Sequence, residues 1–157
     1  MSEDTGAELS PDERRTLDDV LDEIIPPSAD GRLPGAGQLG ISAYANVALG
    51  AMPPVREMIA RSLAALDEIA LRRAGRRFTS LPRPDRVAAL DELAAGEHGF
   101  PPVLILHAFA GYYQEPRVLE ALGLEARPPH PAGYSTVEGD LSLLEPVRRR
   151  GRMYREC

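Results

Sequence analysis

Residues 16–37 read TLDDVLDEIIPPSADGRLPGAG, an amphipathic pattern that ends at two prolines and continues as a Gly/Pro-rich loop. Ser10 lies just before this pattern with Glu13 three residues on, which indicates a helix start with a capping box. The apolar residues then recur at helical spacing, and Pro26 ends the helix. We therefore predict one helix followed by an irregular elbow over residues 28–39. The apolar stripe of this helix consists of Leu17, Val20, Leu21, Ile24 and Ile25.

Proline and glycine also divide the rest of the chain into short segments. Apolar residues between these breaks recur at helical spacing, and Gly75 and Gly96 stand where helices should stop. Glu and Arg residues four apart support the longest of these helices. The predicted helices cover residues 40–49, 54–74, 84–95, 100–113 and 115–123.

No alternating run indicates a sheet, so the predicted fold class is all-α. We expect a small irregular helical bundle of about five to six helices with a long extended C-terminal arm. The chain divides into a flexible N-terminus (1–9), a helical domain (10–124) and an extended arm rich in Pro, Gly and Arg (125–157). The arm lacks helical periodicity, which predicts a segment that is either disordered or laid along another surface.

The composition excludes several classes of function. The chain has 157 residues, a net charge of −6 and one cysteine, Cys157. An acidic chain argues against nucleic acid as the main partner. A single cysteine excludes a disulfide framework and a CxxCH haem site. Acids follow the N-terminal Arg-Arg pair instead of an apolar run, so we expect no export signal and a cytoplasmic location as given, or a periplasmic one if a leader was removed.

The most apolar segment is FPPVLILHAFAGYY, residues 100–113, which contains no charged residue. It predicts a helix buried nearly all round. It is too short to span a bilayer, which needs roughly 20 apolar residues, so we expect no membrane insertion. Its aromatic residues fit either core packing or an interface patch, because Tyr is enriched at interfaces. These aromatic residues are Phe100, Phe109, Tyr112 and Tyr113.

The carboxylates near the first proline pair are the strongest candidates for chemistry. Asp18 and Asp22, like Asp19 and Glu23, are four residues apart and share a helix face. Such pairs could act as acid and base or bind a hard cation, but no His or Cys lies with them. A solvated or partner-facing acidic face is the preferred interpretation. An Arg near Glu23 would offset the unfavourable helix dipole.

The histidines lie on different predicted elements, so each is better explained as a core or interface residue than as a ligand or proton carrier. They are His98, His107 and His130. We predict no catalytic, cofactor-binding or metal-binding residue. The arginines of the arm suit an acidic protein surface or solvent better than RNA. The predicted partner-contact residues are Phe109, Tyr112, Tyr113, Tyr134, Arg148, Arg149, Arg150 and Tyr154.

Two stretches together resemble the gluconate 2-dehydrogenase subunit 3 family, also called its gamma or small subunit. TLDDVLDEIIPPSADGRLPGAGQLGISAYAN, residues 16–46, resembles the N-terminal signature of a helix, Ile-Pro, a short acidic loop, Pro-Gly-Ala and a second helix with an aromatic. FAGYYQEPRVLEALG, residues 109–123, resembles the second signature, and HPAGY, residues 130–134, its usual continuation. The resemblance covers roughly residues 12–135, and the order and spacing of the motifs give it its specificity.

The resemblance implies a role beside an enzyme. Small subunits of this family accompany flavin-dependent dehydrogenases of sugars, sugar acids and related alcohols. The large subunit carries FAD and the catalytic residues, typically in the glucose–methanol–choline oxidoreductase fold, and a c-type cytochrome often completes the complex. Many members also carry a twin-arginine export signal, which this chain lacks as given.

The expected function is therefore that of a non-catalytic small subunit that binds and stabilises an FAD-dependent dehydrogenase or oxidase, with FAD in the partner and no cofactor in this chain. The alternative is a free-standing helical protein-interaction module without a flavoprotein partner.

Overall fold

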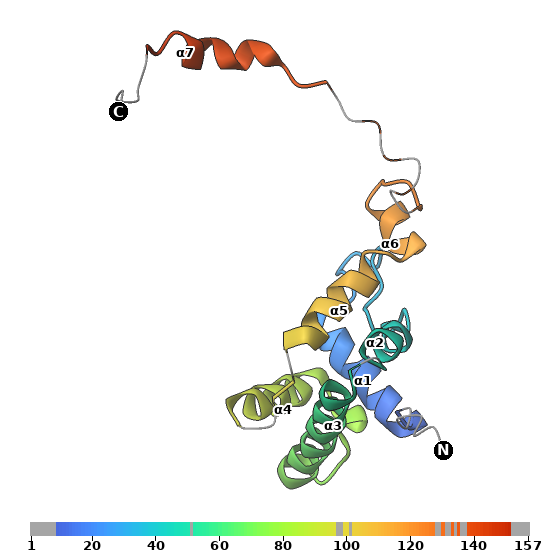
Figure 1. The fold of residues 1–157 in the computed structure, drawn as a ribbon. Helices are drawn as coiled ribbons and strands as arrows, with labels where there is room; N and C mark the ends of the chain where they lie inside the picture. Colours follow the sequence, from blue (N-terminus) through green and yellow to red (C-terminus); the bar gives the residue numbers. More distant parts are fainter. Residues whose placement is uncertain are drawn as a thin grey trace, which may run out of the picture. The chain divides into compact units, whose positions relative to one another are not determined.

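The computed structural model (Figure 1) describes residues 9–50, 52–96, 99–100, 102–127, 130, 133, 135 and 138–151. Over these ranges the chain forms helices and no strand, which confirms the all-α prediction. Contacts within the chain divide it into two compact units, unit 1 (residues 1–127) and unit 2 (residues 128–157). The elements of unit 1 are α1 (Pro11–Ile24), α2 (Ile41–Gly50), α3 (Pro53–Ala74), η1 (Phe78–Ser80), α4 (Arg83–Ala95), α5 (Pro102–Tyr112) and α6 (Pro116–Ala121).

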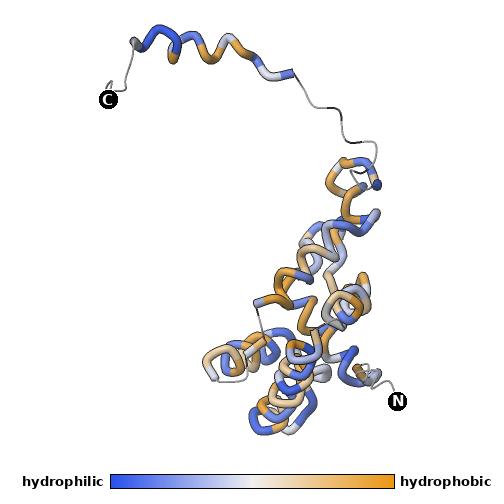
Figure 2. The backbone as a smooth tube through the Cα atoms, in the orientation of Figure 1, coloured by the Kyte–Doolittle hydropathy of each residue, from blue (hydrophilic) through white to orange (hydrophobic). Residues whose placement is uncertain are grey.

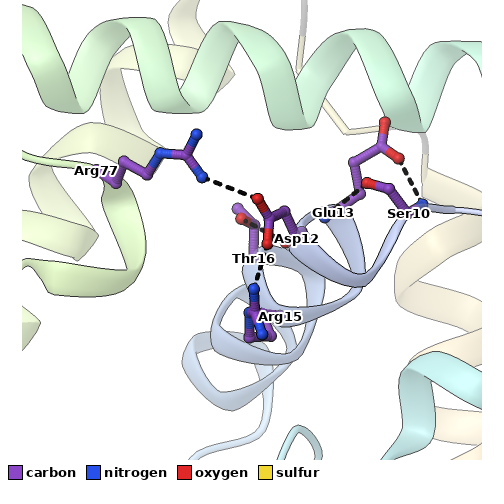
Figure 3. A network of polar contacts seen from close by, with 6 residues as sticks. All are labelled: Ser10, Asp12, Glu13, Arg15, Thr16 and Arg77. Carbon is purple, nitrogen blue, oxygen red and sulfur yellow. Dashed lines mark hydrogen bonds and ion pairs between the residues drawn. The ribbon is translucent and has the colours of Figure 1, made fainter.

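The start of α1 has the expected capping box (Figure 3). The Glu13 N–H donates to the Ser10 hydroxyl at 3.2 Å, and the Ser10 N–H donates to Glu13 Oε2 at 2.7 Å. Two otherwise unsatisfied backbone donors of the first turn are thereby paired. Asp12 in the same turn contacts Arg15 and also Arg77, whose Nη1 lies 3.2 Å from Asp12 Oδ2. The hydrogen bonds from Arg15 and Arg77 lower the pKa of Asp12.

Helix α1 lies at the centre of unit 1. It contacts α2, α3, η1 and α5, whereas α3 packs on α4 and α2 packs on α5. The predicted stripe of α1 does face the core: three of its residues are fully buried, and Ile24 and Ile25 pack against them partly buried. The largest aliphatic and aromatic side chains of the core include Leu17, Leu21, Leu66, Phe78, Leu104 and Tyr112.

The pairing of α3 with α4 depends on a glycine stop and on arginines in the last turn of α3. Gly75 takes a left-handed conformation at φ 65° and donates its N–H to the Leu71 carbonyl, so α3 ends where the sequence predicted. Arg72 and Arg73 both contact Glu92 of α4, with Arg73 Nη1 3.0 Å from Glu92 Oε2. These ion pairs are exposed and contribute little stability.

Unit 2 corrects one prediction. Residues 125–157 were expected to lack regular structure, yet the described part contains η2 (Leu141–Leu144) and α7 (Glu145–Arg148). The Asp140 side chain accepts from the Ser142 N–H at 2.9 Å and caps this helical segment. The sequence pattern did not reveal this segment because two short helices of 4 residues each are too short to show a periodic pattern.

Candidate functional site

Helix α5 has two apolar faces, and one of them is in the core. Leu104, Ala108, Gly111 and Tyr112 are buried, at the i, i+4, i+7, i+8 spacing of a single helix face. Helix α2 lies directly on this face. A Cβ placed on Gly111 would come within 2.6 Å of Tyr44 Cδ1, so the glycine allows the two backbones to approach closely.

The opposite face of α5 is exposed, so the prediction of burial nearly all round was wrong. The cause is packing: α5 contacts α1 and α2 on one side, and no described element of unit 1 covers the other. Figure 2 shows the apolar residues that run along α5. We call the exposed face the α5 stripe: Ile105 (46% exposed), Leu106 (64%), Phe109 (41%) and Tyr113 (50%).

The α5 stripe is suited to binding another protein. It contains no charged side chain, and the Phe109 and Tyr113 rings stack at a centroid distance of 6.2 Å. Contiguous exposed apolar side chains mark interaction sites, and aromatic side chains dominate the binding energy of protein interfaces. Phe109 and Tyr113 were predicted as contacts. Ile105 and Leu106 were missed, because a helix without charges gives no sequence signal of which face is exposed.

Tyr112 is a correction to the predicted partner contacts. Its side chain is only 2% exposed, and its hydroxyl donates to the Pro34 carbonyl at 2.9 Å. Burial raises the pKa of Tyr112 above 10.0. Neighbouring positions on a helix point about 100° apart, so the Tyr112 ring faces the core and the Tyr113 ring faces outward. Tyr112 therefore joins α5 to the elbow instead of contacting a partner.

Replacing Tyr112 with Phe should lower the free energy of unfolding by about 1 kcal/mol, because the Pro34 carbonyl loses its donor while the ring packing remains. Urea unfolding followed by circular dichroism would measure this. Tyr113→Phe, the same change on the exposed neighbour, is the matched control and should be close to neutral. Equal effects of the two changes would contradict the assignment of Tyr112 to the core.

The remaining predicted contacts lie in unit 2. Arg148, Arg149 and Arg150 are exposed at the end of α7, and Arg148 Nη1 lies 3.2 Å from Glu145 Oε1. Tyr134 and Tyr154 lie outside the described residues. The structure thus brings Phe109 and Tyr113 together in unit 1, and the three arginines together in unit 2.

The carboxylates of α1 bind their own chain, which corrects the expectation of a solvated or partner-facing acidic face. Glu23 has a side chain only 4% exposed, with Arg83 Nε at 3.0 Å and Arg86 Nη2 at 2.9 Å. Arg86 also lies 3.0 Å from Asp19. These α4 arginines are the positive charges expected near the C-terminus of α1. Periodicity could not reveal them, because Arg83 lies 60 residues after Glu23 and Arg86 lies 67 residues after Asp19.

Asp22 organises the elbow. Its Oδ1 accepts from the N–H groups of Gly37 and Gln38 at 2.7 and 3.1 Å. A Cβ on Gly37 would lie 2.0 Å from the Asp18 carbonyl oxygen, so the elbow backbone runs directly against α1. The elbow is therefore a packed connection between α1 and α2.

Within the described chain, arginines pair with Asp19 and Glu23 but not with Asp18 or Asp22, and Asp22 accepts from backbone N–H groups instead. Ser42 of α2 hydrogen-bonds to Asp18 through its hydroxyl and its backbone N–H, but within the described residues no donor reaches the buried Oδ1. Burial raises the pKa of Asp18, and the nearby charge of Asp22 raises it further. The neutral acid is thus favoured by folding.

The Asp18→Asn variant should reveal this titration. The folded pKa lies above 3.8, so the protonated carboxyl contributes stability that is fully present below 3.8 and lost as pH rises through the raised pKa. The wild type should therefore lose stability relative to the variant as the pH rises from acidic to neutral, so the difference in free energy of unfolding (wild type minus variant) should decrease. Urea unfolding across this range measures it, with Asp91→Asn on the exposed side of α4 as control. A flat or rising difference would contradict the assignment.

The histidines and carboxylates of the described part of the chain do not gather into a metal-binding group. No group of three or more His, Cys, Asp or Glu residues there could hold a metal ion. His107 lies half-buried on α5 with its ring centroid 6.2 Å from that of Tyr44, His130 is exposed in unit 2, and His98 lies outside the described residues. Over those same ranges, no helix combines the length and apolar composition that crossing a bilayer requires.

Comparison with known proteins gives one match. The family model for gluconate 2-dehydrogenase subunit 3 matches residues 11–125, a range that contains α1 to α6 and ends before unit 2. No curated protein and no solved structure matches the chain.

Proposed function

The chain belongs to the gluconate 2-dehydrogenase subunit 3 family, and from this premise we propose that it is a non-catalytic small subunit. It binds and stabilises a large FAD-dependent dehydrogenase or oxidase that acts on sugars, sugar acids or alcohols. The catalytic subunit supplies the FAD and the reacting groups. The α5 stripe is the observation that carries this proposal.

Burial of the α5 stripe provides the driving force for association. Its aliphatic and aromatic side chains are exposed in the isolated chain, and burying such a side chain contributes about 1.5–3 kcal/mol. Two stacked aromatic rings in the C-terminal half of the stripe supply the rigid anchors that interfaces favour. A catalytic subunit with a complementary apolar surface would be stabilised by the same contact, since binding to the folded state raises its apparent stability.

The stripe is also held in place before a partner arrives. Gly111 allows α2 to lie close to the buried face of α5, and Tyr112 joins α5 to the elbow through its bond to Pro34. A preformed surface loses less conformational entropy on binding. Asp19 and Glu23 of α1 are already paired with arginines of the same chain, so this helix offers a partner few free carboxylates. We therefore assign the main contact of unit 1 to α5.

Co-expression with a large FAD-dependent dehydrogenase from the same genome tests the proposal. Affinity purification through a tag on this chain should recover a yellow complex with the absorbance of oxidised flavin near roughly 450 nm, bound as the cofactor of the large subunit. The yield of soluble flavoprotein should drop when this chain is omitted. A colourless, monomeric protein would contradict the proposal and favour the free-standing interaction module.

A further inference from the structure

Residues 138–151, which we call the C-terminal segment, carry apolar side chains that are exposed in the described part of unit 2. None of the residues of this segment is buried. The segment lies in unit 2 and beyond residue 125, where the family match ends. The exposed apolar side chains are those of Leu141, Leu143, Leu144 and Val147.

The segment encodes its own short helix. Asp140 caps the start by accepting from the Ser142 N–H at 2.9 Å, and Glu145 lies 3.2 Å from Arg148 and 3.9 Å from Arg149. Figure 2 shows apolar and polar residues alternating along η2 and α7. Residues 141–144 form a 3₁₀ turn with about 120° per residue and residues 145–148 an α-helical turn with about 100° per residue. The four apolar side chains then fall on one side with Arg148 at its edge, and Ser142, Glu145 and Arg149 fall on the other. So short a helix is marginal alone and gains its stability from a surface that covers its apolar side.

The charges of the segment are separated along its length. Glu138 and Asp140 lie before the helix, and Arg148, Arg149 and Arg150 lie at its end. With Glu145, three acids balance three arginines, so the net charge of the segment is zero. The negative charges lie toward its start and the positive charges at its end. A complementary surface would be apolar in the middle, basic beside Asp140 and acidic beside the arginines.

We propose, on the basis of the function proposed above, that the C-terminal segment is a second, separately tethered contact with the same catalytic subunit. It docks as an amphipathic helix in an apolar groove of that subunit, with acidic side chains of the groove facing Arg148–Arg150. This is helix-in-groove recognition, in which apolar anchors on one side of the helix supply affinity and the flanking charges supply direction.

The charge pattern favours a protein groove over a membrane or nucleic acid. A helix that binds anionic lipid carries basic residues along its whole polar side, whereas here Glu138, Asp140 and Glu145 occupy half of the charged positions. The same acids would repel phosphates of a nucleic acid. The apolar side has no Trp or Phe to anchor it in a lipid interface.

The connection to unit 1 makes the second contact effective. Residues 128–140 can reach at most about 45 Å when extended. Once the α5 stripe is bound, docking of the segment is intramolecular, so the length of the connecting chain sets its effective concentration. A weak contact of a short helix therefore strengthens the whole complex without a large interface of its own.

The single cysteine, Cys157, allows the test on the full chain. A fluorophore attached there reports by anisotropy when the C-terminal segment becomes immobilised. The probe is the purified flavoprotein subunit from the co-expression, titrated into the labelled chain. The Leu141→Ser/Leu144→Ser/Val147→Ser variant should bind about 10- to 100-fold more weakly and should leave the fluorophore mobile in the complex. Ser142→Ala, on the polar side, should behave as wild type. Equal unfolding curves of the labelled proteins would show that unit 1 is intact.

The outcomes separate this inference from the proposed function. If the triple variant binds as tightly as the wild type with the same anisotropy, the second contact is wrong and the small-subunit role stands. If the wild-type chain forms no complex with the flavoprotein, both are wrong. Immobilisation by vesicles of phosphatidylcholine with phosphatidylglycerol, without flavoprotein, would overturn the assignment of a protein groove.

Discussion

A chain carrying Leu106→Ser and Phe109→Ser should bind the flavoprotein subunit at least about 100-fold more weakly than the wild type. Both side chains are exposed at the centre of the α5 stripe, and truncating a buried interface anchor costs about 2 kcal/mol or more. Neither side chain is in the core, so the free energy of unfolding should stay within about 1 kcal/mol of the wild type. Titration calorimetry and urea unfolding measure the two quantities separately.

The control for this variant replaces exposed apolar side chains elsewhere. Leu71→Ser/Val87→Ser changes one residue on α3 and one on α4, both partly exposed and outside the α5 stripe. Binding of this control should equal that of the wild type. Wild-type affinity of the Leu106→Ser/Phe109→Ser chain would place the interface elsewhere, and a matching loss in the control would point to a general effect of surface polarity.

Gly37→Ala should lower the free energy of unfolding by roughly 3 kcal/mol or more. The new Cβ would lie 2.0 Å from the Asp18 carbonyl oxygen and 2.6 Å from its carbon, both backbone atoms of α1 that cannot turn aside. The elbow must move away from α1, which also weakens the bond from Gly37 to Asp22. Thermal and urea unfolding by circular dichroism would show the loss.

Gly99→Ala is the matched control for this change. Its Cβ would meet Ala94 Cα at an ordinary 3.6 Å, so stability should change by less than about 1 kcal/mol. If the two glycine variants unfold alike, the close approach of the elbow to α1 is not a determinant of the fold. A strongly unstable Gly37→Ala chain should also recover less flavoprotein, because the elbow supports α5 through Pro34 and Tyr112.

These two predictions separate binding from folding in one small subunit. The α5 stripe is exposed and can be changed without disturbing the core, whereas the elbow is packed and cannot. The elbow hydrogen-bonds to α1 through Asp22 and to α5 through Pro34. A change in the elbow therefore acts on the partner only through the position of α5.

Local sequence signals determined where the helices begin and end. Ser10 with Glu13 fixed the start of α1, Pro26 its end and Gly75 the end of α3, because caps and breakers act on backbone groups a few residues away. The motif order also determined the family, which the match over residues 11–125 confirms. Even the need for positive charge near Glu23 followed from the helix dipole alone.

Only the tertiary structure decided which side of each helix is covered. In α5 every position is uncharged, so periodicity could not divide Tyr112, in the core, from Tyr113 and Leu106, on the surface. In α1 the sequence pattern predicted solvated carboxylates, but in the folded chain Arg83 and Arg86 of α4 pair with Glu23. Helix ends follow from neighbours in sequence, but the exposure of a side chain depends on which distant helix packs against it, and a single sequence pattern does not encode that contact.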